Sequence, residues 1–339
     1  MAVVTRSVST NTPASTRYRN MARMAVCALL CYCSSLSAQP VENPQSWLEK
    51  MVHAARTLNY DGTFVYQSRN RTESMRIIHR NDVSGVRERL VSLTGVAREV
   101  LRDNGYVTCI LPDNASVMTS PRRPPAVNRS PLFAVASVPQ FYALKMLGLD
   151  RVAGRVAERL ELKPQDDFRY GMRLWIDRQS GLLLRNDLLH PAHGVLESVA
   201  YTSISMPEQI SDELLKPGIS GDGFRRITWP EREQAIAPSA SEAGWYVRWV
   251  PEGFALRRQG LQQRAGGEAA IEHLVYSDGL ASVSVFIEAL PADANLLKGH
   301  SSMGAASAYG RMIGVHQVTV VGEVPAATVE RIGLSVKAR

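Results

Sequence analysis

Residues 47–66 constrain the fold more than any other stretch, because a helical apolar pattern there runs directly into an aromatic strand pattern. The apolar stripe recurs at the helical period and consists of Trp47, Leu48, Met51, Val52, Ala55 and Leu58. Ser46 and Glu49 have the spacing of a capping box, and Asn59–Gly62 has turn chemistry. Thr63–Tyr66 then places large apolar residues on both faces of a strand. We therefore expect a helix that packs on the first strand of a sheet.

The first 38 residues have the order of a secretory signal peptide. They contain four arginines and no acidic residue, then the apolar run Met24–Cys33, then small residues up to Ala38. The run is too short for a bilayer span, which needs about 20 apolar residues. We expect cleavage after Ala38, with Ser37 as the alternative site and with Met21 or Met24 as alternative start residues. The mature protein is then exported and soluble.

Removing this segment changes both the charge and the cysteine count. The whole chain has 39 basic and 32 acidic residues, and the expected mature chain keeps 35 of the basic ones, for a net charge of +3. Without a concentrated basic face, this balance gives no reason to expect a nucleic-acid partner. Cys109 is then the one remaining cysteine, so we expect no internal disulfide and interpret Cys109 as a small buried strand residue. About 300 residues suffice for two domains.

Residues 62–111 indicate successive antiparallel strands, with a hairpin at Asn104–Gly105. Pro112–Pro131 contains five prolines, which remove amide donors, so we expect a long loop there rather than a central strand. Ser137–Gly148 is apolar around most of its circumference, and we predict a second helix buried against the sheet. Further strands are expected at Arg155–Leu162, Tyr170–Asp177, Leu182–Leu189 and Val195–Met206.

Three candidate chemical sites have plainer interpretations. His190 and His193 have a spacing that can ligate zinc, but Pro191 places them in a turn with no acidic or cysteine partner evident nearby. Asp166–Asp167 is typical of a solvated turn. Gly218–Gly223 lacks the strand, the helix and the lysine of a phosphate-binding loop, so a flexible linker is favoured. We expect no enzyme, no cofactor and no metal site.

Residues 207–243 are rich in Pro, Gly, Ser and Ala, which is typical of a connector. We place a linker at 220–243, between an N-terminal domain (39–219) and a small C-terminal domain (244–339). The elements expected in the small domain include Ile271–Ser277, Ala281–Ala289 and Gln317–Val324 as strands and Ala326–Val336 as a helix. The expected fold class is α+β and mostly antiparallel: a larger sheet with covering helices, then a smaller sheet with one helix.

Several segments, in order along nearly the whole expected mature chain, resemble the MucB/RseB family. They are Tyr60–Tyr66, Arg87–Leu90, Trp249–Phe254 and His316–Thr328. Members of that family are periplasmic negative regulators of the envelope-stress sigma factor. The resemblance implies an N-terminal domain like the lipoprotein carriers of the outer-membrane pathway, with an open, strongly curved sheet (a half-barrel) and helices on its concave side. It also implies a periplasmic protein that binds the periplasmic part of a membrane-spanning anti-sigma factor, shields it from proteolysis and releases it on lipid or lipopolysaccharide signals.

A curved sheet with apolar residues on both faces can bury one face under helices or under an acylated ligand. The candidate cavity residues are Trp47, Met51, Phe64, Tyr66, Ile77 and Phe141. The alternative is that they form an ordinary sealed core. Arg122, Arg123 and Arg129 on the proline-rich segment are candidates for contact with anionic head groups, and that segment is either a gate or a solvated surface loop.

For the protein partner we select residues with the aromatic-plus-arginine composition of interface anchors. They are Trp245, Tyr246, Arg248, Trp249, Arg257 and Arg258. The alternative is that two of the three aromatic residues form the core of the small domain. Two other functions stay open: a periplasmic carrier of lipids or lipoproteins, and an exported hydrolase. The sequence also leaves the ligand and the oligomeric state open, with a homo-oligomer among the options.

Overall fold

In the computed structural model, residues 44–339 form one compact unit. The structure describes residue 2 and residues 43–69, 71–103, 105–121, 140–228, 244–263, 270–289 and 296–339, with the backbone alone at 121, 262 and 263. The expected signal peptide and the candidate residues Arg122, Arg123 and Arg129 lie outside the described residues. Within the described ranges, no helix is both long and apolar enough to cross a membrane.

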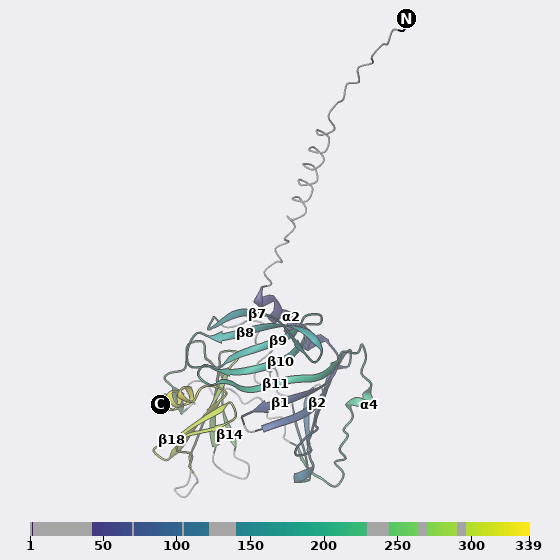
Figure 1. The fold of residues 1–339 in the computed structure, drawn as a ribbon. Helices are drawn as coiled ribbons and strands as arrows, with labels where there is room; N and C mark the ends of the chain where they lie inside the picture. The colour runs from purple at the N-terminus through teal and green to yellow at the C-terminus, as the bar shows by residue number, and fades with distance from the viewer. Residues whose placement is uncertain are drawn as a thin grey trace. The chain divides into compact units, whose positions relative to one another are not determined.

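The larger sheet has twelve strands in the order β12-β6-β5-β4-β3-β2-β1-β11-β10-β9-β8-β7, and Figure 1 shows it as an open, curved sheet. Its strands are β1 (Tyr60–Ser68), β2 (Arg71–Asp82), β3 (Gly85–Ser92), β4 (Glu99–Asp103), β5 (Tyr106–Leu111), β6 (Ser116–Pro121), β7 (Tyr142–Val152), β8 (Arg155–Pro164), β9 (Gly171–Asp177), β10 (Leu183–His190), β11 (Gly194–Ser205) and β12 (Arg225–Thr228). Neighbours are antiparallel except for β12, which pairs in parallel with β6. The expected open antiparallel sheet is confirmed.

Helix α2 (Pro44–Thr57) covers the β7–β9 end of this sheet. Its apolar stripe, including Trp47 and Met51, is buried against strand residues. The helix begins at Pro44, whose fixed φ suits a first turn, so Ser46 and Glu49 lie inside the helix rather than at its start. The expected helix over the start of the fold is therefore present, but it covers the far edge of the sheet and not mainly β1.

The second helix predicted at Ser137–Gly148 is wrong, because the described part of this segment forms strand β7. Side chains alternate along it: Tyr142, Leu144 and Met146 pack into the core, and residues 143 and 145 are exposed. That period of two is a strand pattern. A short, largely apolar segment fits either a helix or a strand, and pairing with β8 decided the outcome.

The long loop predicted at Pro112–Pro131 is wrong for residues 116–121, which form strand β6. The prolines stand at positions 112 and 121, so they leave the amides between them free to pair with β5. On its other side β6 pairs with β12, which lies within the range expected as a linker. Residues 122–131 are outside the described part of the chain.

The smaller sheet has six strands in the order β14-β15-β16-β19-β18-β17. They are β14 (Ala255–Gln263), β15 (Ala270–Ser277), β16 (Ser282–Ala289), β17 (Gly299–Met303), β18 (Ala306–Ile313) and β19 (His316–Gly322). Helix α5 (Ala326–Ser335) buries Val329 and Ile332 against this sheet. A short pair, β13 (Trp245–Val247) with β20 (Val336–Ala338), completes this part. The expected smaller sheet with one helix is confirmed.

Candidate functional site

The two faces of the larger sheet differ, and we call the face that α2 covers the inner face. Residues that pair directly across antiparallel strands point to the same side, so the register identifies the inner residues of every strand. Leu162 and Met172, which pair, lie in the core beneath α2 with the candidates Trp47 and Met51. Phe141 packs against the same core. Three of the six candidate cavity residues therefore lie where side chains already fill the inner face.

An apolar band continues the inner face across strands β1 to β6. It is connected to the α2 end by the pairing of Met172 with Leu188, of Leu188 with Glu197 and of Glu197 with Ser68. The members of the apolar band are Phe64, Met75, Ile77, Leu90, Val100, Cys109 and Met118. Met75 is buried, and the other six are only half-buried. The candidates Phe64 and Ile77 belong to this band, and Tyr66 lies beside it.

The opposite face of strands β2 to β4 is sealed by residues 206–224, which we call the strap and which contain helix α4 (Asp212–Leu215). Ile78 has no exposed surface and packs with Ile210 and Leu215 of the strap. Its neighbour Ile77 points to the inner face and stays half-buried. The structure therefore closes the outer face of these strands more completely than the inner face.

Charged side chains fasten the strap to the outer face. Arg80 and Arg89 donate hydrogen bonds to strap carbonyl oxygens at 3.0 and 3.1 Å. The fully buried carboxylate of Glu99 accepts the backbone amides of Gly218 and Ile219, each at 2.9 Å. Two backbone amides of the segment 218–223 therefore donate to Glu99, whereas a phosphate-binding loop would direct its amides at the ligand.

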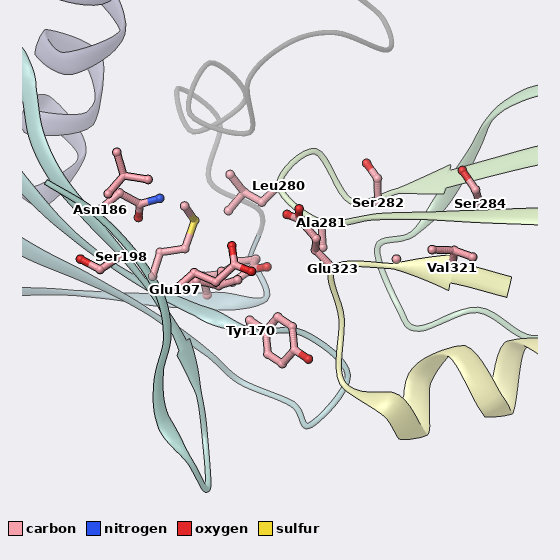
Figure 2. A pocket seen from close by; sticks show the side chains of 15 residues that line it. Tyr170, Asn186, Glu197, Ser198, Leu280, Ala281, Ser282, Ser284, Val321 and Glu323 are labelled. Carbon is pink, nitrogen blue, oxygen red and sulfur yellow. The ribbon is translucent and has the colours of Figure 1, made fainter. Parts of the chain in front are cut away.

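A pocket of about 480 Å³ lies between the inner face and the smaller sheet (Figure 2). Its lining comes from β7, β9, β10 and β11 and from Tyr170 just before β9 on one side, and from residues 280–282, 284 and 321–323 on the other. Met172 and Leu188 contribute apolar surface, and Glu197 and Glu323 contribute carboxylates. Desolvation, and then the charge of Glu197, raise the pKa of Glu323. The pocket therefore combines apolar walls with acidic groups.

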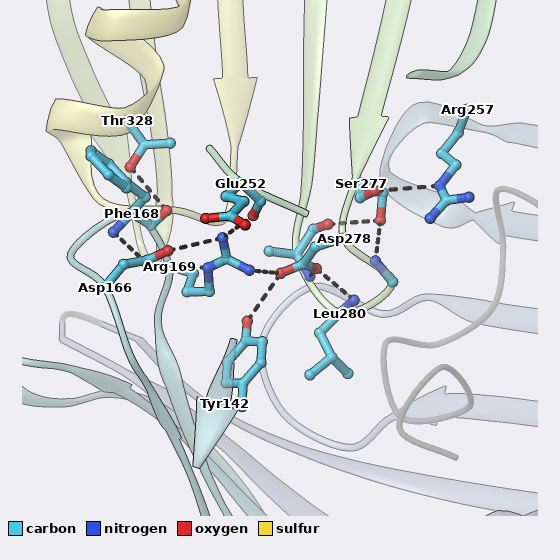
Figure 3. Close-up of polar contacts among 12 residues, drawn as sticks. Tyr142, Asp166, Phe168, Arg169, Glu252, Arg257, Ser277, Asp278, Leu280 and Thr328 are labelled. Carbon is cyan, nitrogen blue, oxygen red and sulfur yellow. Dashed lines mark hydrogen bonds and ion pairs between the residues drawn. The ribbon is translucent and has the colours of Figure 1, made fainter. Parts of the chain in front are cut away.

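A buried ion pair joins the two sheets beside this pocket (Figure 3). The Arg169 guanidinium donates from Nη1 to Asp278 Oδ2 at 2.6 Å, and neither side chain is exposed. Arg169 also donates to the carbonyl oxygen of Glu252 at 2.7 Å. The rings below the guanidinium are those of Phe141, Tyr142 and Phe254. Burial, and then the Asp278 carboxylate, raise the pKa of Tyr142. A buried pair with this many partners stabilises one arrangement of the groups that it joins.

A second contact between the sheets involves the candidate partner residue Trp249. Its ring meets the ring of Phe168 edge-on at a centroid distance of 5.1 Å, and the Arg331 guanidinium lies 3.9 Å above it. Thr328 Oγ1, at the start of α5, donates to the carbonyl oxygen of Phe168 at 2.9 Å. Trp249 therefore belongs to a contact within the chain.

The other candidate partner residues have different exposures. Trp245 packs against the core of the smaller sheet, as Trp249 does. Tyr246, Arg248 and Arg257 are exposed, and Arg258 is half-buried. Alternation along β13 explains the difference, because Trp245 and Tyr246 point to opposite faces. The exposed members leave a smaller candidate surface than the sequence indicates.

The remaining motifs have the following environments. The rings of His190 and His193 lie 4.3 Å apart, and among the described residues no group of three or more His, Cys, Asp or Glu is placed to hold a metal. Asp166 accepts the amide of Phe168 at 3.0 Å, as a turn residue does, but its carboxylate also pairs with the buried Arg169 at 3.0 Å, so it is not simply a solvated turn residue. Burial raises the pKa of the Cys109 thiol, which is the opposite of what a reactive cysteine needs.

Four residues of the pocket and the ion pair were missed by sequence reasoning: Arg169, Glu197, Asp278 and Glu323. Asp278 belongs to an expected hairpin turn, and Arg169 follows an expected solvated turn. Glu197 lies within an expected strand, and Glu323 lies near the end of another. No local pattern marks them, because their significance comes from the approach of distant segments; Arg169 and Asp278, for example, are 109 positions apart.

The chain has an open sheet with an apolar inner band, and a buried ion pair joins this sheet to a smaller one. The two sheets also share a pocket. These features define a two-sheet binding protein. The chain belongs to the MucB/RseB family. The model of the MucB/RseB N-terminal domain matches residues 43–219, and that of the C-terminal domain matches residues 239–337. The resemblance inferred from the sequence is therefore confirmed.

Curated relatives of this chain are named as regulators of sigma factors. The sigma factor AlgU regulatory protein MucB of Pseudomonas aeruginosa is 32% identical over 322 residues, covering 93% of this chain and 98% of the relative. The sigma-E factor regulatory protein RseB of Haemophilus influenzae is 29% identical, covering 91% and 96%. The crystal structure of MucB in complex with MucA(peri) matches with a TM-score of 0.67 at 30% identity, covering 88% of this chain and 99% of that chain. The Pseudomonas aeruginosa MucA/MucB complex matches with a TM-score of 0.68 at 30% identity, covering 87% and 99%.

Proposed function

We propose that this protein binds the periplasmic part of a membrane-spanning anti-sigma factor and thereby restrains an envelope-stress sigma factor. The single observation that carries the proposal is the match of nearly the whole chain to MucB as solved with MucA(peri). In this proposal the segment 1–38 directs export to the periplasm, residues 39–219 and 244–339 are the two domains, and 220–243 link them. The bound anti-sigma segment is shielded from regulated proteolysis.

The inner face supports a second part of the proposal, in which an acylated ligand such as lipopolysaccharide triggers release. The apolar band is half-buried whereas the outer face beneath the strap is sealed. Each buried methylene of an acyl chain contributes about 0.8 kcal/mol, so contact along the band supplies affinity without specific chemistry. Arg122, Arg123 and Arg129 remain candidates for contact with the phosphates of such a ligand.

Calorimetric titration tests both parts. The mature chain is titrated with the purified periplasmic segment of its anti-sigma factor, with and without lipopolysaccharide. We expect saturable binding that lipopolysaccharide weakens, and protection of the bound segment from the stress protease. Absence of binding would refute the partner, and binding that is indifferent to lipopolysaccharide would refute the release step.

Variants of the band separate the two parts. Phe64→Asp places a charge on the inner face and should abolish the response to lipopolysaccharide while preserving binding of the segment. Val83→Asp is the matched control, because Val83 is fully exposed in the turn between β2 and β3. Equal responses of the two variants would contradict a ligand on the apolar band.

The alternative function is a periplasmic carrier of lipids or lipoproteins, which the apolar band also suits. The smaller sheet distinguishes the two, since a carrier needs only the larger one. Affinity capture from membrane extract should retain an anti-sigma factor. Retention of acylated lipoproteins in its place would favour the carrier.

A further inference from the structure

We propose that the pocket between the two sheets is a subsite for one basic side chain, a lysine or an arginine, of a bound polypeptide. The inference rests on the proposed function, because the polypeptide is the periplasmic segment of the anti-sigma factor. It goes further by naming the position on this chain that recognises the segment and the chemistry of the recognised residue.

The shape and polarity of the pocket suit such a side chain. Met172, Leu188 and Val321 contribute apolar surface to the lining. The two carboxylates of the lining belong to Glu197 and Glu323, both labelled in Figure 2. Lysine and arginine have the matching arrangement of an aliphatic stem and a charged head. A purely apolar chain would bury the carboxylates without a partner, which is costly.

No residue in the described lining of the pocket compensates the charge of its two carboxylates. None of the fifteen lining residues, all within the described ranges, is Lys, Arg or His. Glu197 Oε1 accepts the amide of Ala305 at 2.8 Å, which fixes the carboxylate but adds no cation. Desolvation and the neighbouring Glu197 raise the pKa of Glu323, as expected where a carboxylate lacks a positive partner. A basic side chain would supply that partner.

A second acceptor in the pocket also lacks a partner. The side-chain oxygen of Asn186 is buried, and the structure shows no hydrogen bond to it from a described group. Asn186 lines the same pocket as the two carboxylates. The lining thus includes three residues with acceptor oxygens, and lysine brings three N–H donors whereas arginine brings five. A metal ion fits less well, because no group of three or more His, Cys, Asp or Glu among the described residues is placed to hold one.

Because the pocket lies between the two sheets, a basic side chain bound in it also links binding to the arrangement of the sheets. One wall belongs to the larger sheet and the other to the smaller sheet, and Tyr142 and Leu280 belong both to the wall and to the surroundings of the buried ion pair. An inserted basic side chain contacts both sheets at once. The affinity for the polypeptide therefore depends on how the two sheets are arranged. An acylated ligand that alters this arrangement would lower that affinity.

Charge-removing variants test the proposal on the full mature chain. Glu197→Gln and Glu323→Gln keep shape, and glutamine at 197 can still accept the amide of Ala305. Each should weaken binding of the segment about tenfold, the effect expected for loss of a charged hydrogen bond, and should flatten the salt dependence of the affinity. Glu208→Gln, an exposed carboxylate outside the pocket, is the matched control and should bind like the wild type.

The partner side is tested by replacing each lysine and arginine of the segment with alanine in turn. One replacement should weaken binding to the wild type and have little effect on binding to E323Q, as a double-mutant cycle requires for a direct contact. If E197Q and E323Q bind the segment like E208Q, the subsite is refuted while the proposed function stands. If the wild type itself does not bind, the proposed function fails. If the variants instead change only the response to lipopolysaccharide, the pocket holds an acyl chain and the proposal is overturned.

Discussion

Replacing Arg169 with glutamine tests whether the buried ion pair holds the two sheets together. The substitution removes the guanidinium that faces Asp278 at 2.6 Å and leaves a carboxylate with no exposed surface and no cation. Breaking a buried pair by removing one partner costs about 3–5 kcal/mol. The bond to the Glu252 carbonyl at 2.7 Å is lost as well. We therefore expect R169Q to lower the free energy of unfolding by an amount in that range.

Urea unfolding of the mature chain, followed by tryptophan fluorescence, measures the loss. Trp249, one of the five tryptophans, lies in the second contact between the sheets, so part of the signal comes from that contact. Arg71→Gln is the control, because Arg71 pairs with Glu73 at the surface and such pairs contribute about 0–1 kcal/mol. The R169Q loss should persist at high salt, since a buried pair is screened weakly. An R169Q chain as stable as R71Q would refute the structural role of the pair.

Asp278→Asn separates charge from shape in the same pair. Asparagine retains an oxygen for the amides of Leu280 and Ala281, which Asp278 Oδ1 accepts at 2.8 and 2.7 Å. D278N should still destabilise the chain, because Arg169 then loses its fully buried counter-ion and keeps only the carboxylate of Asp166, which is a quarter exposed. The double variant R169Q/D278N should cost less than the sum of the two single variants. Simple additivity would show that the two side chains act independently.

Three further predictions concern stability. Ile78→Ala, on the sealed face, should lower the free energy of unfolding by about 2–5 kcal/mol. Ile77→Ala, on the half-buried band, should lower it clearly less, and equal losses in urea unfolding would contradict the difference between the faces. Burial, and then Arg258, lower the pKa of His273 from 6.5 to about 4, so the folded chain binds fewer protons than the unfolded chain between these values. Stability from this group is therefore present above pH 6.5 and is lost as the pH falls toward 4. H273F should lose that part of the pH dependence of the free energy of unfolding. An unchanged pH profile of stability would refute the assignment. Gly253→Ala should cost about 1–2 kcal/mol from its positive φ alone, and more from the Phe141 ring, with which an added Cβ would clash. An unchanged thermal midpoint would argue against this packing.

The contacts between the sheets bear on the proposed regulation. The ion pair and the shared pocket lie side by side, and both involve Tyr142. A regulator that releases its partner on a signal needs an element whose arrangement the signal can bias. The contact that contains Arg169 is fully buried, which favours a defined arrangement, while the pocket beside it leaves room for a partner side chain.

The sequence by itself determined the order and type of most elements. Alternation of apolar residues located strands such as 155–162 and 171–177, and the helical period located helices α2 and α5. It also indicated the family, because the motifs at 60–66 and 316–328 retain their order. These features depend on local periodicity and on near neighbours, which a single chain displays directly.

Tertiary structure decided what local patterns leave open. Residues 142–152 have apolar content that fits a helix or a strand, and β8 supplied the pairing that made them a strand. Arg169 and Asp278 look like ordinary turn residues until folding brings them within 2.6 Å in a site without water-exposed surface. The inner and outer faces acquired different roles only when the strap covered Ile78 and left Ile77 half-buried. The physical reason is the same in each case: burial and charge pairing depend on segments distant in the chain, and their energies exist only once those segments meet.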